Sequence, residues 1–400
     1  MYDYHYFTPI GITNWRDSNK LFGIKPNDRL QHIYCLGKTG VGKSTLLINM
    51  ALDDIQKGYG ICVIDPHGET ADTILKYIPE HRKKDLVYFN STDLDHLPGF
   101  NPLYKVPEHE RHLVASEIVQ TFKKIWIDSW GPRLEYILRF AILTLLEYPT
   151  ATLLDIQPLL LDKAFRSLVL QFTTNENILS FWFNEFDKYP PSLKADAISP
   201  ILNKAGVFRA NATLHGIVGQ QGGISLETVM NSSQILVCNL SKGLIGEDVS
   251  TLLGSLLTTG MQTTAMRRAH LLHEERKPFY LYIDEAHSFL TTSFATMLSE
   301  VRKYKVGLFL THQYLEQLSE EIRTAILGNV GTIICFRLGA ADAKVMAEEF
   351  YPIFTIEDFI NLPSHSIYLK LLIDGTTSVP FSATTLPIAA IRTPRLSNDQ

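Results

Sequence analysis

The sequence predicts an α/β protein in which a mainly parallel β-sheet is interrupted by an all-α insertion. Short apolar segments rich in β-branched and aromatic residues recur along the chain, and helical segments such as 44–57 and 294–304 separate several of them. Most of these apolar segments are continuous rather than alternating, which is typical of parallel strands covered by helices on both faces. The expected strands are 33–36, 61–65, 86–89, 234–240, 279–284, 306–311, 332–336 and 366–372.

The interval 103–218 lacks this pattern. It contains helical segments such as HERHLVASEIVQTFKKIW and PRLEYILRFAILTLLEY, and no convincing strand. Proline and glycine residues between the segments are expected to end helices. These residues are Pro132, Pro149, Pro158, Pro190, Pro191 and Gly206. We therefore expect a core in two parts, 1–102 and 219–388, around an insertion domain at 103–218, followed by a C-terminal tail at 389–400.

Composition excludes several classes of protein. The 37 Lys and Arg residues against 42 Asp and Glu residues give a net charge of −5, which excludes a basic protein that coats nucleic acid over its whole surface. It does not exclude a protein that grips nucleic acid with a few loops. A hydrophobic fraction of 45% with 20% charged residues excludes general disorder.

The sequence also predicts where in the cell the protein lies. No charge-free apolar segment reads as a membrane-spanning helix, and MYDYHYFTPIG lacks the features of a signal peptide, so we expect a cytoplasmic protein. The four cysteines, Cys35, Cys62, Cys238 and Cys335, lie in separate apolar segments and form no CxxC pair. We expect them to be reduced and buried in core strands.

The strongest motif is a phosphate-binding loop between an expected strand and an expected helix. It fits the pattern GxxxxGK[ST], in which glycines let backbone N–H groups turn toward phosphates at the positive end of the helix. The expected nucleotide-binding residues are Gly37, Lys38, Thr39, Gly40, Val41, Gly42, Lys43, Ser44 and Thr45. Lys43 is expected to reach the β and γ phosphates, and Ser44 to bind Mg²⁺. No NKxD segment is present, which favours ATP over GTP.

An acidic pair follows another expected strand. Asp284 is expected to bind Mg²⁺ with Ser44, and Glu285 to polarise the attacking water, because both would lie at the edge of the sheet where the phosphate loop opens. Gln313 ends the strand VGLFLTHQ at the same edge and is expected to sense the γ phosphate or to orient water.

Ring ATPases commonly use an arginine from a neighbouring subunit to stabilise the transition state. Arg302, Arg323 and Arg337 are candidates, and spacing alone does not choose among them.

Residues 284–287 spell DEAH, which raises the alternative of a superfamily-two helicase. The separation between Lys43 and Asp284 is long for such helicases, and the sequence has neither an SAT tripeptide nor a terminal QxxGRxxR motif. This alternative is therefore the weaker one.

The motifs GKTGVGKSTLL, IDPHGE, WGPRLEYILR, NLSKGLIGED, LYIDEAHSF, EVRKYKVGLFLTHQYLEQL and GNVGTIICFRLGAADA occur in that order. With these motifs in this order, the chain resembles the cytosolic ATPase part of type IV secretion coupling proteins (the TraD/TraG group). It also resembles the wider FtsK–HerA class of DNA-pumping ATPases. The resemblance covers about residues 8–388.

The resemblance implies a homo-hexameric ring with a central channel through which ATP hydrolysis drives DNA. It also implies that the helical insertion meets the relaxosome or secretion-channel proteins. It places Arg302 at the arginine finger, Gln313 at the sensor position, and Asp65 and His67 on a loop beside the nucleotide.

The chain also departs from the coupling proteins. They normally begin with transmembrane helices, which are not seen here, so we expect either a protein that docks on a partner at the inner membrane or a stand-alone DNA motor. Ala286 and His287 stand where many relatives have an aromatic residue and Gln. The leading hypothesis is an ATP- and Mg²⁺-dependent DNA translocase, and the alternative is a docking platform whose assembly ATP controls.

Overall fold

The computed structural model describes residues 6–388, so the expected tail at 389–400 lies outside the described residues. The main sheet has 11 strands in the order β2-β1-β13-β10-β9-β3-β8-β7-β4-β6-β5. In that order the strands are β2 (Leu21–Ile24), β1 (Thr8–Thr13), β13 (Phe381–Thr385), β10 (Ser366–Lys370), β9 (Thr332–Cys335), β3 (Ile33–Leu36), β8 (Val306–His312), β7 (Phe279–Ile283), β4 (Gly60–Asp65), β6 (Ile235–Asn239) and β5 (Leu86–Asn90). A separate hairpin pairs β11 (Leu372–Ile373) with β12 (Thr376–Thr377).

The strands from β9 to β6 are parallel, and those from β10 to β2 are antiparallel. The predicted α/β fold with a mainly parallel sheet is therefore confirmed. Each of the eight expected strands has a counterpart, but the segment expected at 366–372 is antiparallel and shorter than expected. The strands β1, β2 and β13 were not expected, because threonine and glycine interrupt their apolar pattern.

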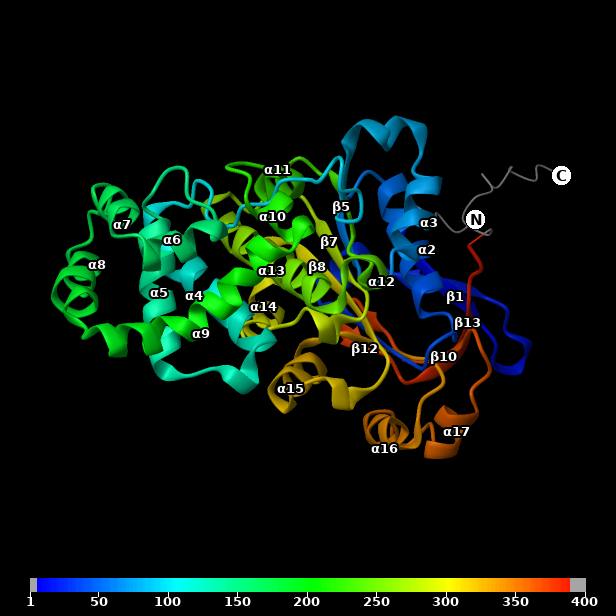
Figure 1. The fold of residues 1–400 in the computed structure, drawn as a ribbon. Coiled ribbons are helices and arrows are strands. Elements are labelled where there is room, and N and C mark those ends of the chain that lie inside the picture. The colour runs from blue at the N-terminus through cyan, green and yellow to red at the C-terminus, as the bar shows by residue number, and fades with distance from the viewer. Residues whose placement is uncertain (1–5, 389–400) are drawn as a thin grey trace. The chain divides into compact units, whose positions relative to one another are not determined.

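The chain divides into two compact units. Among the described residues, the first comprises 6–88, 226–239 and 264–388, and it contains most of the sheet. Its helices are α1 (Pro26–Arg29), α2 (Lys43–Gln56), α3 (Glu69–Tyr77), α11 (Leu226–Asn231), α14 (Phe294–Glu300), α15 (Glu320–Asn329), α16 (Ala340–Glu349) and α17 (Ile356–Asn361). Alternate residues of β3 and β4, such as Cys35 and Val63, join the apolar side of α2 in one buried cluster. Figure 1 shows α2 and α3 next to each other.

The second unit comprises 89–225 and 240–263, and the expected insertion domain at 103–218 lies within it. All regular elements between 103 and 218 are helical, as expected for this interval. The helices that begin in this unit are α4 (Arg111–Ile125), α5 (Pro132–Leu145), α6 (Ile156–Leu161), α7 (Lys163–Leu170), α8 (Glu176–Ser180), α9 (Pro191–Ala210), α10 (Ala212–Val218), α12 (Lys242–Ile245) and α13 (Glu247–Arg267). Trp182 is fully buried among them and donates its indole N–H to the Thr144 hydroxyl at 2.8 Å.

Two of the expected helix ends are wrong. Gly206 lies inside α9, where it meets no neighbouring atoms that a side chain would need to displace. Pro158 lies in the first turn of α6, where the missing N–H would have no helical partner. The four cysteines are free and buried in β3, β4, β6 and β9, as expected. Among the described residues, no helix has the length and hydropathy needed to cross a membrane.

A buried ion-pair cluster ties several elements of the first unit together. The guanidinium of Arg29 pairs with the carboxylate of Asp54, and it stacks 3.7 Å from the ring centre of Tyr280. The Tyr282 hydroxyl donates to Asp54 and accepts from Arg29. Burial alone would lower the pKa of Arg29, but Asp54 and the two tyrosines raise it well above its ordinary value. Every charge in this cluster therefore has a partner.

Candidate functional site

The phosphate loop begins where β3 ends and leads directly into α2, which starts at Lys43. Gly40 and Gly42 have φ of +75° and +117°, a conformation that favours glycine because it has no Cβ. A Cβ atom on Gly42 would also lie 2.8 Å from Nδ1 of His365. Since β8, β7 and β4 follow β3 in parallel, their carboxyl ends meet at the same edge as this loop.

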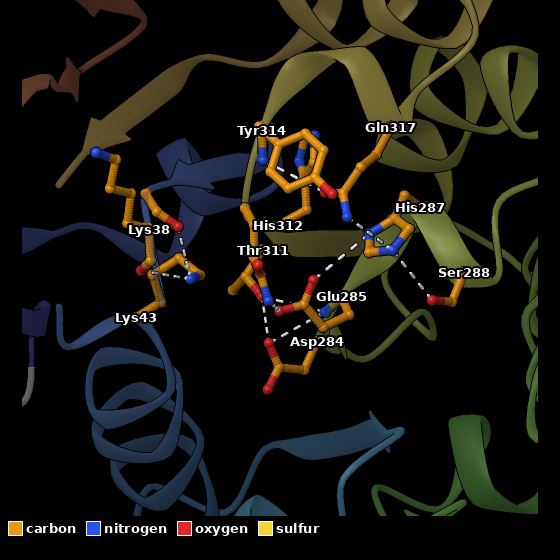
Figure 2. A network of polar contacts seen from close by, with 12 residues as sticks. Lys38, Lys43, Asp284, Glu285, His287, Ser288, Thr311, His312, Tyr314 and Gln317 are labelled. Atoms are coloured by element: carbon orange, nitrogen blue, oxygen red, sulfur yellow. Dashed lines mark hydrogen bonds and ion pairs between the residues drawn. The ribbon is translucent and has the colours of Figure 1, made fainter. Parts of the chain in front are cut away.

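Lys43 is buried within the loop that precedes it. Its ammonium group donates to the carbonyl oxygens of Gly37, at 2.7 Å, and Lys38, at 3.0 Å (Figure 2). Both contacts are to neutral carbonyls, and no salt bridge to Lys43 is found among residues 6–388. A dianionic phosphate would therefore meet a cation whose charge is not neutralised.

Asp284 and Ser44 face each other across this edge. The Ser44 hydroxyl lies 3.4 Å from Oδ2 of Asp284 and is exposed. The other carboxylate oxygen of Asp284 accepts from the Thr311 hydroxyl at the end of β8 and from the N–H of Glu285. These two hydrogen bonds orient Asp284 so that Oδ2 stays directed at Ser44.

Glu285 is held in a strained backbone position. Its φ of +47° and ψ of +53° are left-handed, which is uncommon for a residue other than glycine and often marks functional sites. Oε1 accepts from the Gln313 side-chain amide at 2.9 Å. Oε2 is buried without a hydrogen-bond partner among residues 6–388, and Nδ1 of His287 lies 3.5 Å from it. We name Asp284, Glu285, Thr311 and Gln313 together the acidic edge.

His312 lies between Thr311 and Gln313 on β8, but its ring faces away from Asp284. Nδ1 lies 2.9 Å from the Tyr34 hydroxyl on β3. Burial, followed by the nearby ring of His287, lowers the pKa of His312 to about 3. The residue is therefore neutral at physiological pH and connects β8 with the strand that carries the phosphate loop.

The other flank of the phosphate loop is built from the end of β9 and the turn before β10. The carbonyl of Arg337 accepts from the N–H of Lys38 at 3.0 Å, and the carbonyl of Val41 accepts from the N–H of His365 at 2.8 Å. Phe336 packs closely on Gly37. A Cβ atom added to Gly37 would lie 2.6 Å from the Cβ atom of Phe336. Sequence reasoning missed Thr311, Phe336 and His365, because no local motif surrounds them.

Asp65 is the last residue of β4, the strand next to β7, and His67 lies two residues further along the chain. Both carboxylate oxygens of Asp65 accept backbone N–H groups, from His67 and Ala71. Burial raises the pKa of Asp65, and these hydrogen bonds lower it only in part. Asp65 therefore holds the turn that starts α3, and His67 is exposed on it.

The three candidate arginines lie in different places. Arg302 is exposed in the 3₁₀ turn Val301–Tyr304, which precedes β8 and thus lies at the opposite edge of the sheet from the phosphate loop. Its charge contributes to the lowered pKa, about 4, of His32, whose burial is the larger cause. Arg323 is half-buried in α15, and Arg337 lies two residues after the end of β9, beside Lys38. The structure does not bring Arg302 or Arg323 to the acidic edge of the same chain.

The donor set fits a magnesium–nucleotide complex. Ser44 and Asp284 supply hard oxygen donors, which Mg²⁺ prefers, and Mg²⁺ is commonly held by one or two carboxylates together with substrate phosphates. Within residues 6–388 there is no group of three or more His, Cys, Asp or Glu side chains that could hold a metal ion.

Comparison with known proteins places this site in a family. The family model DUF87, described as the central domain of the helicase HerA, matches residues 21–243. The plasmid coupling protein TrwB, solved with an ATP analogue, is similar with a TM-score of 0.66 and 14% identity, covering 96% of this chain and 94% of TrwB. A TrwB complex with a GTP analogue gives 0.63 and 13%, covering 94% and 89%.

VirB4 of Thermoanaerobacter pseudethanolicus is similar with a TM-score of 0.62 and 14% identity, covering 95% of this chain and 96% of VirB4. Comparison with curated proteins found no match. At these identities the solved structures establish the fold alone, which is that of TrwB and VirB4. The family match covers more than half of the chain and includes the phosphate loop, so the protein belongs to the HerA central-domain family of the FtsK–HerA class.

Proposed function

We propose that this protein is an ATP- and Mg²⁺-dependent DNA translocase of the coupling-protein type. We propose further that it acts as a hexameric ring that moves DNA in conjugative transfer or a related process. One observation carries the proposal: the phosphate loop, the Ser44–Asp284 pair and the Glu285–Gln313 pair lie at one edge of the sheet. The family match and the likeness to TrwB, a plasmid coupling protein, support it.

Each side chain then has a distinct task. Lys43 exchanges the carbonyls of Gly37 and Lys38 for the β and γ phosphates, where its charge stabilises the transferred group. Ser44 and Asp284 would hold Mg²⁺, which would supply positive charge against the phosphates. Glu285 accepts a proton from the attacking water or orients it, and Gln313 fixes the carboxylate for this task.

Among residues 6–388, Arg337 is the candidate arginine that lies beside the phosphate loop, where its carbonyl accepts from the N–H of Lys38. Arg302 is exposed at the opposite edge of the sheet, where it can reach a neighbouring subunit. We propose that Arg302 completes the adjacent site in the ring. An arginine supplied in this way contributes about 10³–10⁵ in turnover in comparable NTPases.

The net charge of −5 is compatible with DNA as the cargo. A ring multiplies a few basic loop residues by the number of subunits, and contacts to phosphates need no base recognition. We propose a cytoplasmic protein that docks on a membrane partner or acts as a stand-alone motor. The helical interval 103–218 is the proposed insertion domain that meets the relaxosome or secretion-channel proteins.

The test measures both nucleotide hydrolysis and movement along DNA. Purified protein is assayed for Mg²⁺-dependent hydrolysis of ATP and of GTP, with and without single- and double-stranded DNA, and for displacement of a protein roadblock from DNA. We expect ATP hydrolysis that DNA stimulates, roadblock displacement, and rings visible by electron microscopy with a non-hydrolysable ATP analogue. Arg302→Ala is expected to lose turnover while it still binds nucleotide, and mixing it with Lys43→Ala subunits should restore part of the activity.

A docking platform is the second candidate, and one observation favours it. The second unit exposes large apolar side chains that are not part of its buried core: Leu113, Ile127, Leu161, Phe172 and Phe183. In this case ATP would control assembly rather than drive transport. ATP-dependent ring formation without DNA stimulation over a range of salt concentrations, and without roadblock displacement, would favour the platform over the translocase.

A further inference from the structure

A chain of polar side chains runs from the candidate base to the segment that follows β8. Glu285 Oε2 lies 3.5 Å from Nδ1 of His287, and Nε2 of His287 lies 3.2 Å from the amide nitrogen of Gln317 (Figure 2). Gln317 belongs to the 3₁₀ turn Leu315–Gln317, and His287 to the turn Ala286–Ser288. We name this series of contacts, from Glu285 through His287 to Gln317, the relay. It links two turns that are distant in sequence.

The partners of Gln317 determine which nitrogen of His287 carries the proton. The side-chain oxygen of Gln317 accepts from the N–H of Tyr314 at 3.3 Å, which identifies the other end of the amide as the NH₂ group. An amide NH₂ group only donates, so Nε2 of His287 must accept. Neutral His287 therefore carries its proton on Nδ1, directed at the open oxygen of Glu285.

We propose that His287 is a positioning residue for Glu285, an inference that rests on the proposed function. Gln313 holds one carboxylate oxygen at 2.9 Å, and Nδ1 of His287 faces the other at 3.5 Å. At 3.5 Å the second contact is longer than a normal hydrogen bond, and catalytic hydrogen bonds commonly tighten only when the substrate is bound. Two donors from different turns then fix the plane of the carboxylate toward the attacking water.

The fold does not depend on His287. In the same turn Ala286 and Phe289 are buried and supply the packing, whereas the side chain of His287 is 22% exposed. Other polar neighbours of the ring are the Ser288 hydroxyl at 3.4 Å and His312, whose ring centre is 6.1 Å away. Replacement of His287 should therefore change the orientation of Glu285 more than it changes stability.

Two substitutions separate positioning from packing. In His287→Asn the amide nitrogen can take the place of Nδ1 and still donate to Glu285, whereas in His287→Gln it takes the place of Nε2 and cannot. We measure kcat and KM for ATP with the full chain, and thermal unfolding of each variant. His273→Gln, at an exposed histidine outside the site, is the matched control.

We expect His287→Gln to lose about tenfold to a hundredfold in kcat with KM within about twofold, because a displaced catalytic group loses rate rather than affinity. His287→Asn should retain kcat within about threefold of the wild type. The kcat of Gln317→Leu should lie between those of the two His287 variants, because this substitution only removes the contact that sets the tautomer of His287. All variants should unfold at the wild-type temperature.

Equal kcat values for His287→Asn and His287→Gln, whether both normal or both low, would overturn the positioning role. A change that appears only in KM would overturn it as well. Failure of the proposed function is a separate result: a wild-type chain without ATPase activity, or a Glu285→Gln variant with full activity.

Discussion

The first unit contains two buried groups of charged side chains that differ in one respect. In the buried ion-pair cluster, the carboxylate of Asp54 is neutralised by Arg29 and hydrogen-bonded by Tyr282. In the acidic edge, Asp284 and Glu285 are held only by neutral donors, and one oxygen of Glu285 has no hydrogen-bond partner among the described residues. Nε of Arg29 also has no hydrogen-bond partner among the described residues, but the charges of the cluster neutralise each other without a ligand, whereas those of the acidic edge do not.

This difference distinguishes charged groups that stabilise the fold from charged groups that bind a ligand. A buried carboxylate that lacks a cation is unfavourable unless something else compensates it, and proteins retain such arrangements where a ligand supplies the missing charge. Lys43 and Ser44 stand beside the acidic edge, so magnesium and phosphate would complete the set of charges. Substitutions should therefore affect activity at the acidic edge and stability at the buried ion-pair cluster.

The largest expected effect is on catalysis. Glu285→Gln keeps the hydrogen bond to Gln313 within reach but removes the base, so turnover should fall about 10²–10⁴-fold while nucleotide still binds. Steady-state hydrolysis and binding of a fluorescent ATP analogue measure the two quantities. Lys43→Ala is the comparison, because it should lose binding and turnover together. Full turnover in Glu285→Gln would remove the functional assignment of the acidic edge.

The next effect is on stability. Asp54→Leu leaves the Arg29 guanidinium buried without its partner, so the free energy of unfolding should fall by about 3–5 kcal/mol. Urea denaturation checks this value. The double variant Arg29→Met with Asp54→Leu should recover much of the loss, because neither charge remains buried.

A matched control for this prediction lies one residue away. Asp53 pairs with Lys57, which follows the last residue of α2, and keeps some contact with solvent. Asp53→Asn should lower the free energy of unfolding by about 1 kcal/mol at most. If Asp53→Asn and Asp54→Leu were equally harmful, burial of the ion pair would not explain the difference.

A smaller effect is expected from the glycines of the phosphate loop. In Gly42→Ala the new Cβ would lie 2.8 Å from His365 at a φ of +117°, so the loop must shift. We expect about tenfold weaker nucleotide binding and a loss of about 2 kcal/mol in unfolding free energy. Gly40→Ala, at a φ of +75° with open space around it, should cost only about 1 kcal/mol.

Isothermal titration with ATP and urea denaturation measure the two glycine variants side by side. Equal effects of Gly40→Ala and Gly42→Ala would show that the contact with His365 does not constrain the loop.

The last expected effect is a dependence of stability on pH. Burial lowers the pKa of His32 to about 4 and that of His312 to about 3, whereas in the unfolded chain each titrates near 6.5. Between pH 6.5 and 4 the unfolded state therefore binds more protons, and the free energy of unfolding falls on acidification. The slope should approach about 1.4 kcal/mol per pH unit for each histidine.

His32→Asn should reduce this slope, and asparagine tolerates the φ of +65° at this position. His81→Asn, at an exposed histidine, should leave the slope unchanged. Urea denaturation at several pH values provides the measurement, and an unchanged slope in His32→Asn would contradict the assignment of a buried neutral imidazole.

Much of the fold could be predicted from local patterns. The continuous apolar segments identified each strand of the parallel part, and the interval 103–218 contains helices only, as expected. The antiparallel strands β1, β2 and β13 were missed, because their pairing joins the two ends of the described chain, such as Gly11 with Thr385, and neither segment is strongly apolar. Pairing over such a distance leaves no local signal.

The candidate site shows the same division. Lys43, Ser44, Asp284, Glu285 and Gln313 were predicted, and the structure brings them together at one sheet edge, although their chemical roles stay proposals. The relay through His287 and the flank with His365 were not predicted, because each depends on which turn lies beside which strand end.

The sequence alone determined the phosphate loop, the acidic pair after a strand, the reduced cysteines and the helical interval, because each is a pattern within one short segment. Only the tertiary structure decided which groups surround them. The order β9-β3-β8-β7 places Arg337 and His365 on one flank of the phosphate loop and Thr311, Glu285 and His287 on the other. Strand order follows from the packing of the whole sheet, so it decides where charge is neutralised and where it is left for a ligand.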